Sequence, residues 1–387
     1  LIYSFSTFAV GFLARPIGGI LFGHFGDRLG RKAALVTALT LMGLATTIIG
    51  LLPTYSSIGV LAPLALILMR FLQGLAIVGQ WGGAMLLVTE NAPADRRGFY
   101  GGFAQAGAPM GVVLANLAFL AVTASVSEEA FMSWGWRIPF IASLLLVGLA
   151  LYVQLRLEDT PAFKELKAAS EGKTEDTGPK SKSPILKALS TYPKQIVLAA
   201  GAFLSVQVSF YIFIVFIMSY GTDPDGLALS RTDMLTAVLI SSFAQVPAIF
   251  LAASYSDRHG RRGIYKMGAL AMAVWGFCVF PLMDTGSLLA ITLALTVGQI
   301  FIGMMYGPQA AFFTELFSTE VRYSGATLGY QFGAIVGGAF APTIAVKLWT
   351  DFDIVWVSAY IAFASMLTLI SVMLLTETYK SNLDEEI

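Results

Sequence analysis

The sequence is poor in the residues from which most catalytic and metal sites are built. It contains one cysteine, Cys278, and two histidines, His24 and His259, in 387 residues. A single cysteine cannot form a disulfide within the chain or a cysteine-based metal centre, and its apolar surroundings predict a small buried side chain. A membrane enzyme would need a nucleophile with its base or a set of metal ligands. We therefore expect a protein that is not an enzyme and binds no cofactor.

Charged residues are also scarce. They make up 12% of the chain against 56% hydrophobic residues, and the mean hydropathy is +0.74. Because a soluble globular protein carries about 25% charged residues, this composition favours a protein of the lipid bilayer. The 24 basic and 24 acidic residues balance, and nothing in their distribution indicates a nucleic-acid partner.

Long hydrophobic windows predict an all-α polytopic membrane protein. Uncharged windows such as 34–52, 138–155 and 354–375 are long enough to cross a hydrocarbon core of ~30 Å as helices. The expected spans are eleven, at 2–23, 34–52, 60–89, 99–123, 137–156, 195–218, 233–254, 265–283, 288–314, 324–347 and 354–375.

The loops between these spans alternate in their content of lysine and arginine. One side carries nearly all of the basic residues, and the other carries only Arg137, Arg231 and Lys347. The positive-inside rule places the first side in the cytoplasm. We therefore expect the central linker and the C-terminus to be cytoplasmic.

A charged motif occurs twice, about half a chain apart. The run GHFGDRLGRK at Gly23–Lys32 returns as ASYSDRHGRR at Ala253–Arg262, 230 residues later. A second pair keeps nearly the same spacing, with the stretch 90–98 answered by 315–322. A chain that repeats its charged loops between membrane spans consists of two related halves, which is the plan of a secondary transporter.

The odd number of spans conflicts with this repeat. In the second half a span, 195–218, precedes the motif-bearing span, and the first half has no counterpart. We therefore expect that one N-terminal helix is missing from this sequence and that the fold has two six-helix bundles. Residues 1–157 would form the first bundle with five visible spans, and 195–387 the second with six spans and a short tail. The cytoplasmic linker 158–194 would hold a short interfacial helix at 161–167 and a flexible part at 171–183.

Motifs spread over nearly the whole chain resemble the major facilitator superfamily. Within it, the sequence is similar to the metabolite–proton symporters, which include carriers of shikimate, α-ketoglutarate, citrate, dicarboxylates and proline or betaine, and the shikimate branch looks most similar. The sequences that carry the resemblance are FLARPIGG at Phe12–Gly19, GDRLGRK at Gly26–Lys32, RFLQG at Arg70–Gly74, WGGA at Trp81–Ala84, ENAP at Glu90–Pro93, GWRIPF at Gly135–Phe140 and VRYSGA at Val321–Ala326. The chain departs from the family at Gln80, where members usually carry Glu.

The resemblance implies a monomeric secondary transporter of the bacterial inner membrane. It would import a small organic acid, shikimate-like or a di- or tricarboxylate, by proton symport with alternating access. One alternative is a carrier of a zwitterion such as proline or betaine. Another is a drug/proton antiporter, although exporters usually carry Gly-Pro where this chain has Ala108-Pro109.

The resemblance also implies that the repeated motif works as a latch on the cytoplasmic side. Asp27 would face the N-terminus of the helix beginning at Ser324, where free N–H groups favour an anion, and Arg31 would pair with Glu90. In the mirror set, Asp257 would face the helix near Gly98, and Arg261 would pair with Glu315. The full set also includes Arg28, Arg258 and Arg322. The alternative is that these charges only fix topology, but topology requires cations and no repeated aspartates.

Polar residues inside otherwise apolar spans are candidates for the substrate site. Arg15 and Arg70 are expensive to bury without a partner; Arg70 is the better candidate for the substrate, and Arg15 stays open between that role and a structural pair with the missing helix. Cations, amides and phenols without carboxylates suit a small hydroxylated anion. The other candidates are Gln73, Gln80, Gln105, Asn116, Gln207, Tyr211, Gln245, Gln299, Tyr306, Tyr330 and Gln331.

Proton coupling requires a titratable group in the pathway, and no visible span contains a deeply placed Asp, Glu or His. Three explanations stay open. The acid lies on the missing helix, which we favour; or Asp27 and Glu90 take part; or transport is uncoupled.

Glycines at four-residue spacing predict close helix packing. Gly325, Gly329, Gly333 and Gly337 lie on one stripe of the 324–347 span. A looser set at 101, 102, 107 and 111 lies on the 99–123 span. Small residues at this spacing allow a neighbouring backbone to approach, as in other membrane helices.

Overall fold

The computed structural model describes residues 2–171 and 184–380, and all the regular secondary structure in these ranges is helical. Ten helical segments among them are long and apolar enough to cross a membrane, and α1 (Ile2–Arg28) is a further helix of 27 residues. The prediction of an all-α polytopic fold is confirmed. The spanning segments after α1 are α2 (Arg31–Leu51), α4 (Leu61–Asn91), α5 (Arg97–Ser125), α7 and α8 (Arg137–Arg156), α11 to α12 (Pro193–Thr222), α13 (Arg231–His259), α14 (Arg261–Met283), α15 (Leu288–Glu315), α16 to α17 (Arg322–Asp351) and α18 (Ile354–Leu374).

Three of these spans are interrupted. The first break separates α7 (Arg137–Ile141) from α8 (Leu144–Arg156). A π-helical turn, η2 (Ile212–Phe216), follows α11 (Pro193–Tyr211), and another, η3 (Ile335–Ala339), follows α16 (Arg322–Ala334). Such turns widen a helix locally and are frequent at functional sites.

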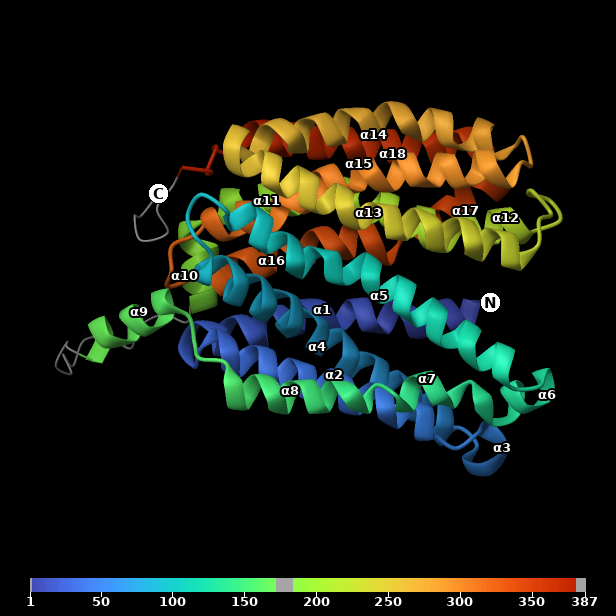
Figure 1. Cartoon of the computed structure of the whole chain (residues 1–387), viewed down its shortest axis with the longest axis horizontal. Coiled ribbons are helices and arrows are strands. Elements are labelled where there is room, and N and C mark those ends of the chain that lie inside the picture. Colours follow the sequence, from blue (N-terminus) through green and yellow to red (C-terminus); the bar gives the residue numbers. More distant parts are fainter. Residues whose placement is uncertain (1, 172–183, 381–387) are drawn as a thin grey trace.

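The helices pack as two groups with contacts between them (Figure 1). In the first half, α4 packs against α1 and α2, and α8 packs on α2. In the second half, α15 packs against α13 and α14, and α18 covers α14 and α11. Helices α5 and α13 join the halves on one side, and α1 and α16 join them on the other.

The first and last described residues lie at opposite ends of the molecule (Figure 1). The N-terminus lies at the end that carries α3 (Tyr55–Ile58) and α6 (Glu128–Ala130). The other end carries the linker helices α9 (Pro161–Glu171) and α10 (Pro184–Thr191), and we call it the motif end because both copies of the charged motif lie there. The short linker helix expected at 161–167 is therefore present and extends to Glu171, and the rest of the flexible part expected at 171–183 lies outside the described residues.

Glycines of α16 form a flat contact with α11. A Cβ on Gly333 would lie 2.6 Å from the Ala200 carbonyl oxygen, and one on Gly329 would lie 2.7 Å from the Ala199 Cβ. Two glycines of the α5 set make no such contact, because a Cβ on Gly107 or Gly111 would meet no atom within 4 Å. The expectation of close packing therefore fails for these two glycines.

The lone cysteine also differs from expectation. Cys278 is partly exposed and is not a core residue, since it lies on the outer side of α14, with its thiol turned to the carbonyl of Val274 one turn earlier. An apolar run in a membrane helix contains residues that face lipid as well as residues that face the core, and hydropathy alone does not distinguish them.

Gly333→Ala should lower the melting temperature of the purified protein in detergent. The new methyl group meets a backbone carbonyl that cannot move aside, so α11 and α16 must separate. The matched control is Gly111→Ala, which adds the same group in open space and improves helix propensity by about 1 kcal/mol. A Gly333→Ala protein that melts at or above the temperature of Gly111→Ala would disprove the tight contact.

Candidate functional site

Each copy of the charged motif forms the junction between two long helices. Helix α1 ends at Arg28 and α2 begins at Arg31, so only Leu29 and Gly30 separate them. Gly30 has φ 112°, and its counterpart Gly260, between α13 and α14, has φ 98°. At both positions an added Cβ would collide with the carboxylate of an acidic side chain. The turn therefore requires glycine for its backbone angle and for space.

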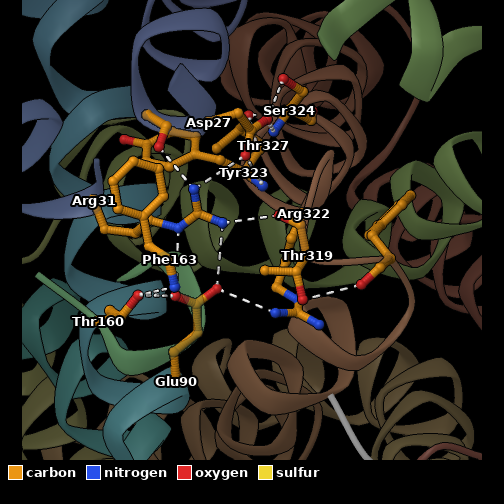
Figure 2. Close-up of polar contacts among 12 residues, drawn as sticks. Asp27, Arg31, Glu90, Thr160, Phe163, Thr319, Arg322, Tyr323, Ser324 and Thr327 are labelled. Carbon is orange, nitrogen blue, oxygen red and sulfur yellow. Dashed lines mark hydrogen bonds and ion pairs between the residues drawn. The ribbon is translucent and has the colours of Figure 1, made fainter. Parts of the chain in front are cut away.

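Asp27 connects the first half to the second (Figure 2). Its carboxylate accepts hydrogen bonds from the backbone N–H groups of Tyr323 (3.2 Å) and Ser324 (3.0 Å) and from the Ser324 hydroxyl (2.7 Å). These N–H groups belong to the first turn of α16, where the helix dipole favours a negative charge. The Arg31 guanidinium lies 3.4 Å from the same carboxylate.

Glu90, at the end of α4, lies between two arginines (Figure 2). Arg31 approaches it to 3.3 Å from its own half, and Arg322 approaches it to 3.2 Å from the other half. Arg31 also donates to the backbone carbonyl of Thr319 (3.0 Å) across the boundary. The charged ends of all three side chains are almost completely buried. Removal of one member of such a buried network typically costs about 3–5 kcal/mol.

The second half repeats this arrangement. Asp257 accepts hydrogen bonds from the backbone N–H groups of Gly98 (2.7 Å) and Phe99 (2.8 Å), in the first turn of α5. Arg261 forms a two-point contact with Glu315, at 2.9 and 3.2 Å. The two halves therefore exchange equivalent contacts, each aspartate meeting a helix N-terminus of the opposite half.

Two acid–threonine pairs complete the network, and the sequence interpretation missed them. Asp159 accepts from the N–H of Arg31 (2.9 Å), and the hydroxyl of Thr160 donates to Glu90 (2.5 Å). Glu377 accepts from the N–H of Arg261 (2.8 Å), and Thr378 donates to Glu315 (2.7 Å). Both pairs directly follow the last helix of a half, so the similarity of Leu157–Thr160 to Leu375–Thr378 was the available signal.

A cavity of about 110 Å³ lies between the two halves. The first half contributes Arg15, Ile77 and Ala108. The candidate residues that line it from the second half are Gln207, Tyr211, Gln245, Tyr306 and Tyr330. Tyr211 is the last residue of α11 before the π-turn η2.

Two groups in this cavity are free to bind a ligand. Both amide atoms of Gln245 are buried without a hydrogen-bond partner, as is Nε of Arg15. The Arg15 guanidinium lies 3.8 Å above the ring of Phe12, and within the described ranges it forms no ion pair with a carboxylate.

Arg70 lies in a neighbouring cavity of about 230 Å³ within the first half. Its guanidinium donates to Gln73 (3.2 Å), and Gln73 donates to Thr46 (2.7 Å). Arg15 lines this cavity as well, so the two cavities meet at that side chain.

An aromatic stack separates the central cavity from the motif end. Trp81 of the first half lies on Tyr330 of the second at a centroid distance of 3.7 Å, and Phe203 covers the other face at 4.0 Å. Gln105 supports the stack, since it accepts from the Trp81 indole (2.8 Å) and donates to the Tyr306 carbonyl (2.9 Å). Gln105 therefore joins the halves here and does not line the cavity.

The remaining candidates lie apart from both cavities. The amide of Asn116 donates to the Val112 carbonyl of its own helix (2.9 Å), and Gln80 is half-buried on α4. Gln299 and Gln331 are buried; both amide atoms of Gln299 and Oε1 of Gln331 have no hydrogen-bond partner. In the described part of the chain, no cluster of three His, Cys, Asp or Glu side chains could hold a metal ion.

Comparison with known proteins agrees with this architecture. The sequence matches the Major Facilitator Superfamily over residues 3–327 and again over 229–386. It is 40% identical to the inner membrane metabolite transport protein YhjE of Escherichia coli, covering 98% of this chain and 85% of the relative. It is also 35% identical to the Escherichia coli shikimate transporter, with the same coverage, and 29% identical to the proline/betaine transporter of Salmonella typhimurium, over 98% of this chain and 75% of the relative.

A solved transporter structure has the same fold. The proton:xylose symporter XylE, bound to 6-bromo-6-deoxy-D-glucose, superposes with a TM-score of 0.73 at 17% identity, covering 96% of this chain and 84% of that one. The family match covers more than half of the chain, and metabolite transport proteins align along nearly its whole length. This protein is a multi-pass membrane protein and belongs to the Major Facilitator Superfamily of transporters.

Proposed function

We propose that this protein imports a small organic acid together with protons by alternating access. The observation that supports this most is the pairing of a polar cavity between the halves with an equivalent set of buried charges from each half at one end. In a rocking mechanism, a central site opens to one side while contacts close the other.

In this proposal the motif end is the cytoplasmic gate. Asp27 and Asp257 hold it shut through their helix N-termini, and Arg322 adds an ion pair across the boundary. The basic residues concentrated at this end support a cytoplasmic orientation in the bacterial inner membrane. Residues 1–157 and 195–387 then act as the two rocking bundles, joined by 158–194, in a monomer.

We assign the substrate anion to Arg15 and not to Arg70. Arg15 is the arginine that lines the cavity between the halves, and its guanidinium can hold a carboxylate through two hydrogen bonds. The amides of Gln207 and Gln245 and the hydroxyls of Tyr306 and Tyr330 would bind hydroxyl groups of the substrate.

A zwitterionic substrate such as proline or betaine is the second candidate. The same cavity is lined by the aromatic rings of Phe203, Phe210, Tyr211, Tyr306 and Tyr330. Aromatic faces attract quaternary ammonium groups, so this cavity could bind an ammonium group beside a carboxylate held by Arg15.

The coupling proton has few candidate sites in the described residues. No acidic residue lines either cavity. The buried acids nearest to the pathway are those of the gate, Asp27 and Glu90 in the first half. Protonation of either would weaken contacts that close the motif end, which would link proton binding to opening.

Uptake into proteoliposomes tests the function directly. Vesicles containing the purified protein receive labelled shikimate, α-ketoglutarate, citrate, proline or betaine, with and without an imposed pH gradient. We expect accumulation of one organic acid, increased when the outside is acidic. Accumulation of betaine or proline alone would select the zwitterion, and uptake that ignores the gradient would exclude proton coupling.

Arg15→Lys should raise the apparent KM for the transported acid by about tenfold or more, because a charge-assisted pair of hydrogen bonds is reduced to a single point contact. Asn116→Ala is the matched control, since this amide bonds only within its own helix among the described residues and should leave KM unchanged. A normal KM in Arg15→Lys together with a raised KM in Arg70→Lys would move the anion site to the neighbouring cavity.

Asp27→Asn should slow transport while leaving expression and substrate binding intact. The amide keeps the size of the side chain but loses the charge that meets the α16 N-terminus, a contact worth roughly 0.3–2 kcal/mol. Asp257→Asn should have a milder effect, because Asp257 accepts two backbone N–H groups and lacks the hydroxyl bond that Ser324 gives to Asp27. Turnover of Asp27→Asn at the wild-type rate would show that the contact does not control gating.

Arg31→Ala and Glu90→Ala should each impair transport, and the exchange Arg31→Glu/Glu90→Arg should restore only part of it. Restoration is incomplete because Glu90 also binds Arg322 and Thr160. In the exchanged protein these two side chains face an arginine at position 90 and lose their carboxylate partner. Initial uptake rates of the wild type, the two alanine variants and the double variant Arg31→Ala/Glu90→Ala close a mutant cycle and give the coupling energy of the pair. Simple additivity of the two single losses would disprove the pairing.

A further inference from the structure

An apolar groove lies on the outer face of the second half, away from the central cavity. It has a volume of about 360 Å³ between α13, α14 and α15. Among its lining residues Leu251 is 72% exposed and Ile300 is 36% exposed, so the groove is open to its surroundings at these side chains. The lining residues are Ala244, Pro247, Ala248, Leu251, Ala252, Tyr255, Ile264, Ile300 and Met304. Because these helices span the membrane, the space opens toward lipid chains and not toward water.

Small side chains on α13 create this space. Ala244, Ala248 and Ala252 recur every fourth residue and form one wall, and Pro247 removes one backbone hydrogen bond within the helix. The resulting groove therefore runs parallel to the helices, as an extended hydrocarbon chain would.

The equivalent surface of the first half is filled. By the 230-residue offset, Phe22 of α1 takes the place of Ala252, and its ring packs where a Cβ on Gly79 of α4 would lie. Gly18, in the place of Ala248, lies against the backbone of Leu75 with room for no more than a hydrogen. The groove is therefore a property of this sequence in its second half and not a general consequence of the repeated fold.

The end of the groove nearest the motif end carries cationic and hydrogen-bonding groups. The imidazole of His259 stacks on the ring of Tyr255 at a centroid distance of 4.2 Å, and its Nδ1 lies 3.3 Å from the Tyr255 carbonyl. Nε2 of the exposed ring is left for a ligand. Arg258 lies on the same stripe of α13 as Leu251 and Tyr255, by helical periodicity, and is exposed.

Acidic side chains at this end are already engaged. Asp257 is turned to the N-terminus of α5, and Glu377 caps the N-terminus of α14. The mouth of the groove therefore presents Arg258 without a neighbouring carboxylate that would neutralise it among the described ion pairs. An apolar channel below and a cation above complement a molecule with a hydrocarbon tail and an anionic head.

We propose that this groove binds one anionic phospholipid, with an acyl chain between α13, α14 and α15 and the phosphate at Arg258 and His259. The bilayer supplies this ligand at high local concentration, and the orientation proposed above affects only which leaflet it comes from. A bound chain would fill the space beside Pro247, so the lipid would become part of the packing of α13.

Native mass spectrometry of the purified full-length chain tests the proposal. The protein in detergent is titrated with phosphatidylglycerol and, separately, with phosphatidylcholine of the same acyl chains. We expect one phosphatidylglycerol to be retained at a concentration about fivefold lower than phosphatidylcholine, the contribution of one cation near an anionic headgroup. Equal retention of the two lipids, or no retained lipid, would overturn the proposal.

Two variants separate the tail from the headgroup. Ala244→Phe fills the groove and should remove the tightly bound lipid of either kind. If that variant does not fold, Leu251→Trp replaces it, because the larger ring at the exposed position 251 also occupies the groove. The double change Arg258→Gln/His259→Gln should keep lipid binding but abolish the preference for phosphatidylglycerol.

The first half provides matched controls. Leu21→Phe and Arg28→Gln alter the positions equivalent to Leu251 and Arg258, where the groove is filled, and should leave both lipid affinities unchanged. If Ala244→Phe and Leu251→Trp both retain lipid as the wild type does, the lipid binds elsewhere. If the control variants lose as much bound lipid as the groove variants, the binding is not specific to the groove.

Discussion

A negative charge held against the first turn of a helix is the interaction on which this structure depends. Asp27 and Asp257 each take this position on a helix of the opposite half, so the two halves are joined by a pair of equivalent contacts. A buried carboxylate is stable only with its partners in place. Arg31, Glu90 and Arg322 form one buried network with it, so loss of one charge leaves the others without their partners.

The central cavity follows from this constraint. With the motif end closed, the aromatic stack on Trp81 separates the cavity from the charged network, and Gln105 fixes the stack from the side. Tyr211, which lines the cavity, is followed directly by the π-turn η2. On α4, Trp81 of the stack lies nine residues before Glu90 of the charged network, a rise of roughly 13 Å.

The membrane helices and the family resemblance could be predicted from the sequence. Hydropathy predicted the membrane helices, and the repeated motif carried the family resemblance, because charges in apolar surroundings have few alternative explanations. The grouping of the polar residues could not be predicted, since Arg15 and Arg70 are both deep cations on apolar helices and only tertiary packing sends them to different cavities. Asp159 and Glu377 were missed because a single acid after a helix is a common pattern. Their role is visible only in the fold, where they accept hydrogen bonds from the N–H groups of Arg31 and Arg261 at the starts of α2 and α14.

The length of chain between Asp27 and its partners has a consequence for biosynthesis. The first half can complete its own charge network once Thr160 has been made, but the α16 turn that receives Asp27 is 296 residues further along than Asp27 itself. At typical translation rates of 5–20 residues per second, the remaining stretch takes roughly ten to thirty seconds. During this interval Asp27 of the first half lacks the N–H groups of Tyr323 and Ser324 that bind its carboxylate in the complete protein. Joining the two halves is thus a late step of assembly, and in the gating mechanism proposed above it uses the same contacts that each transport cycle breaks.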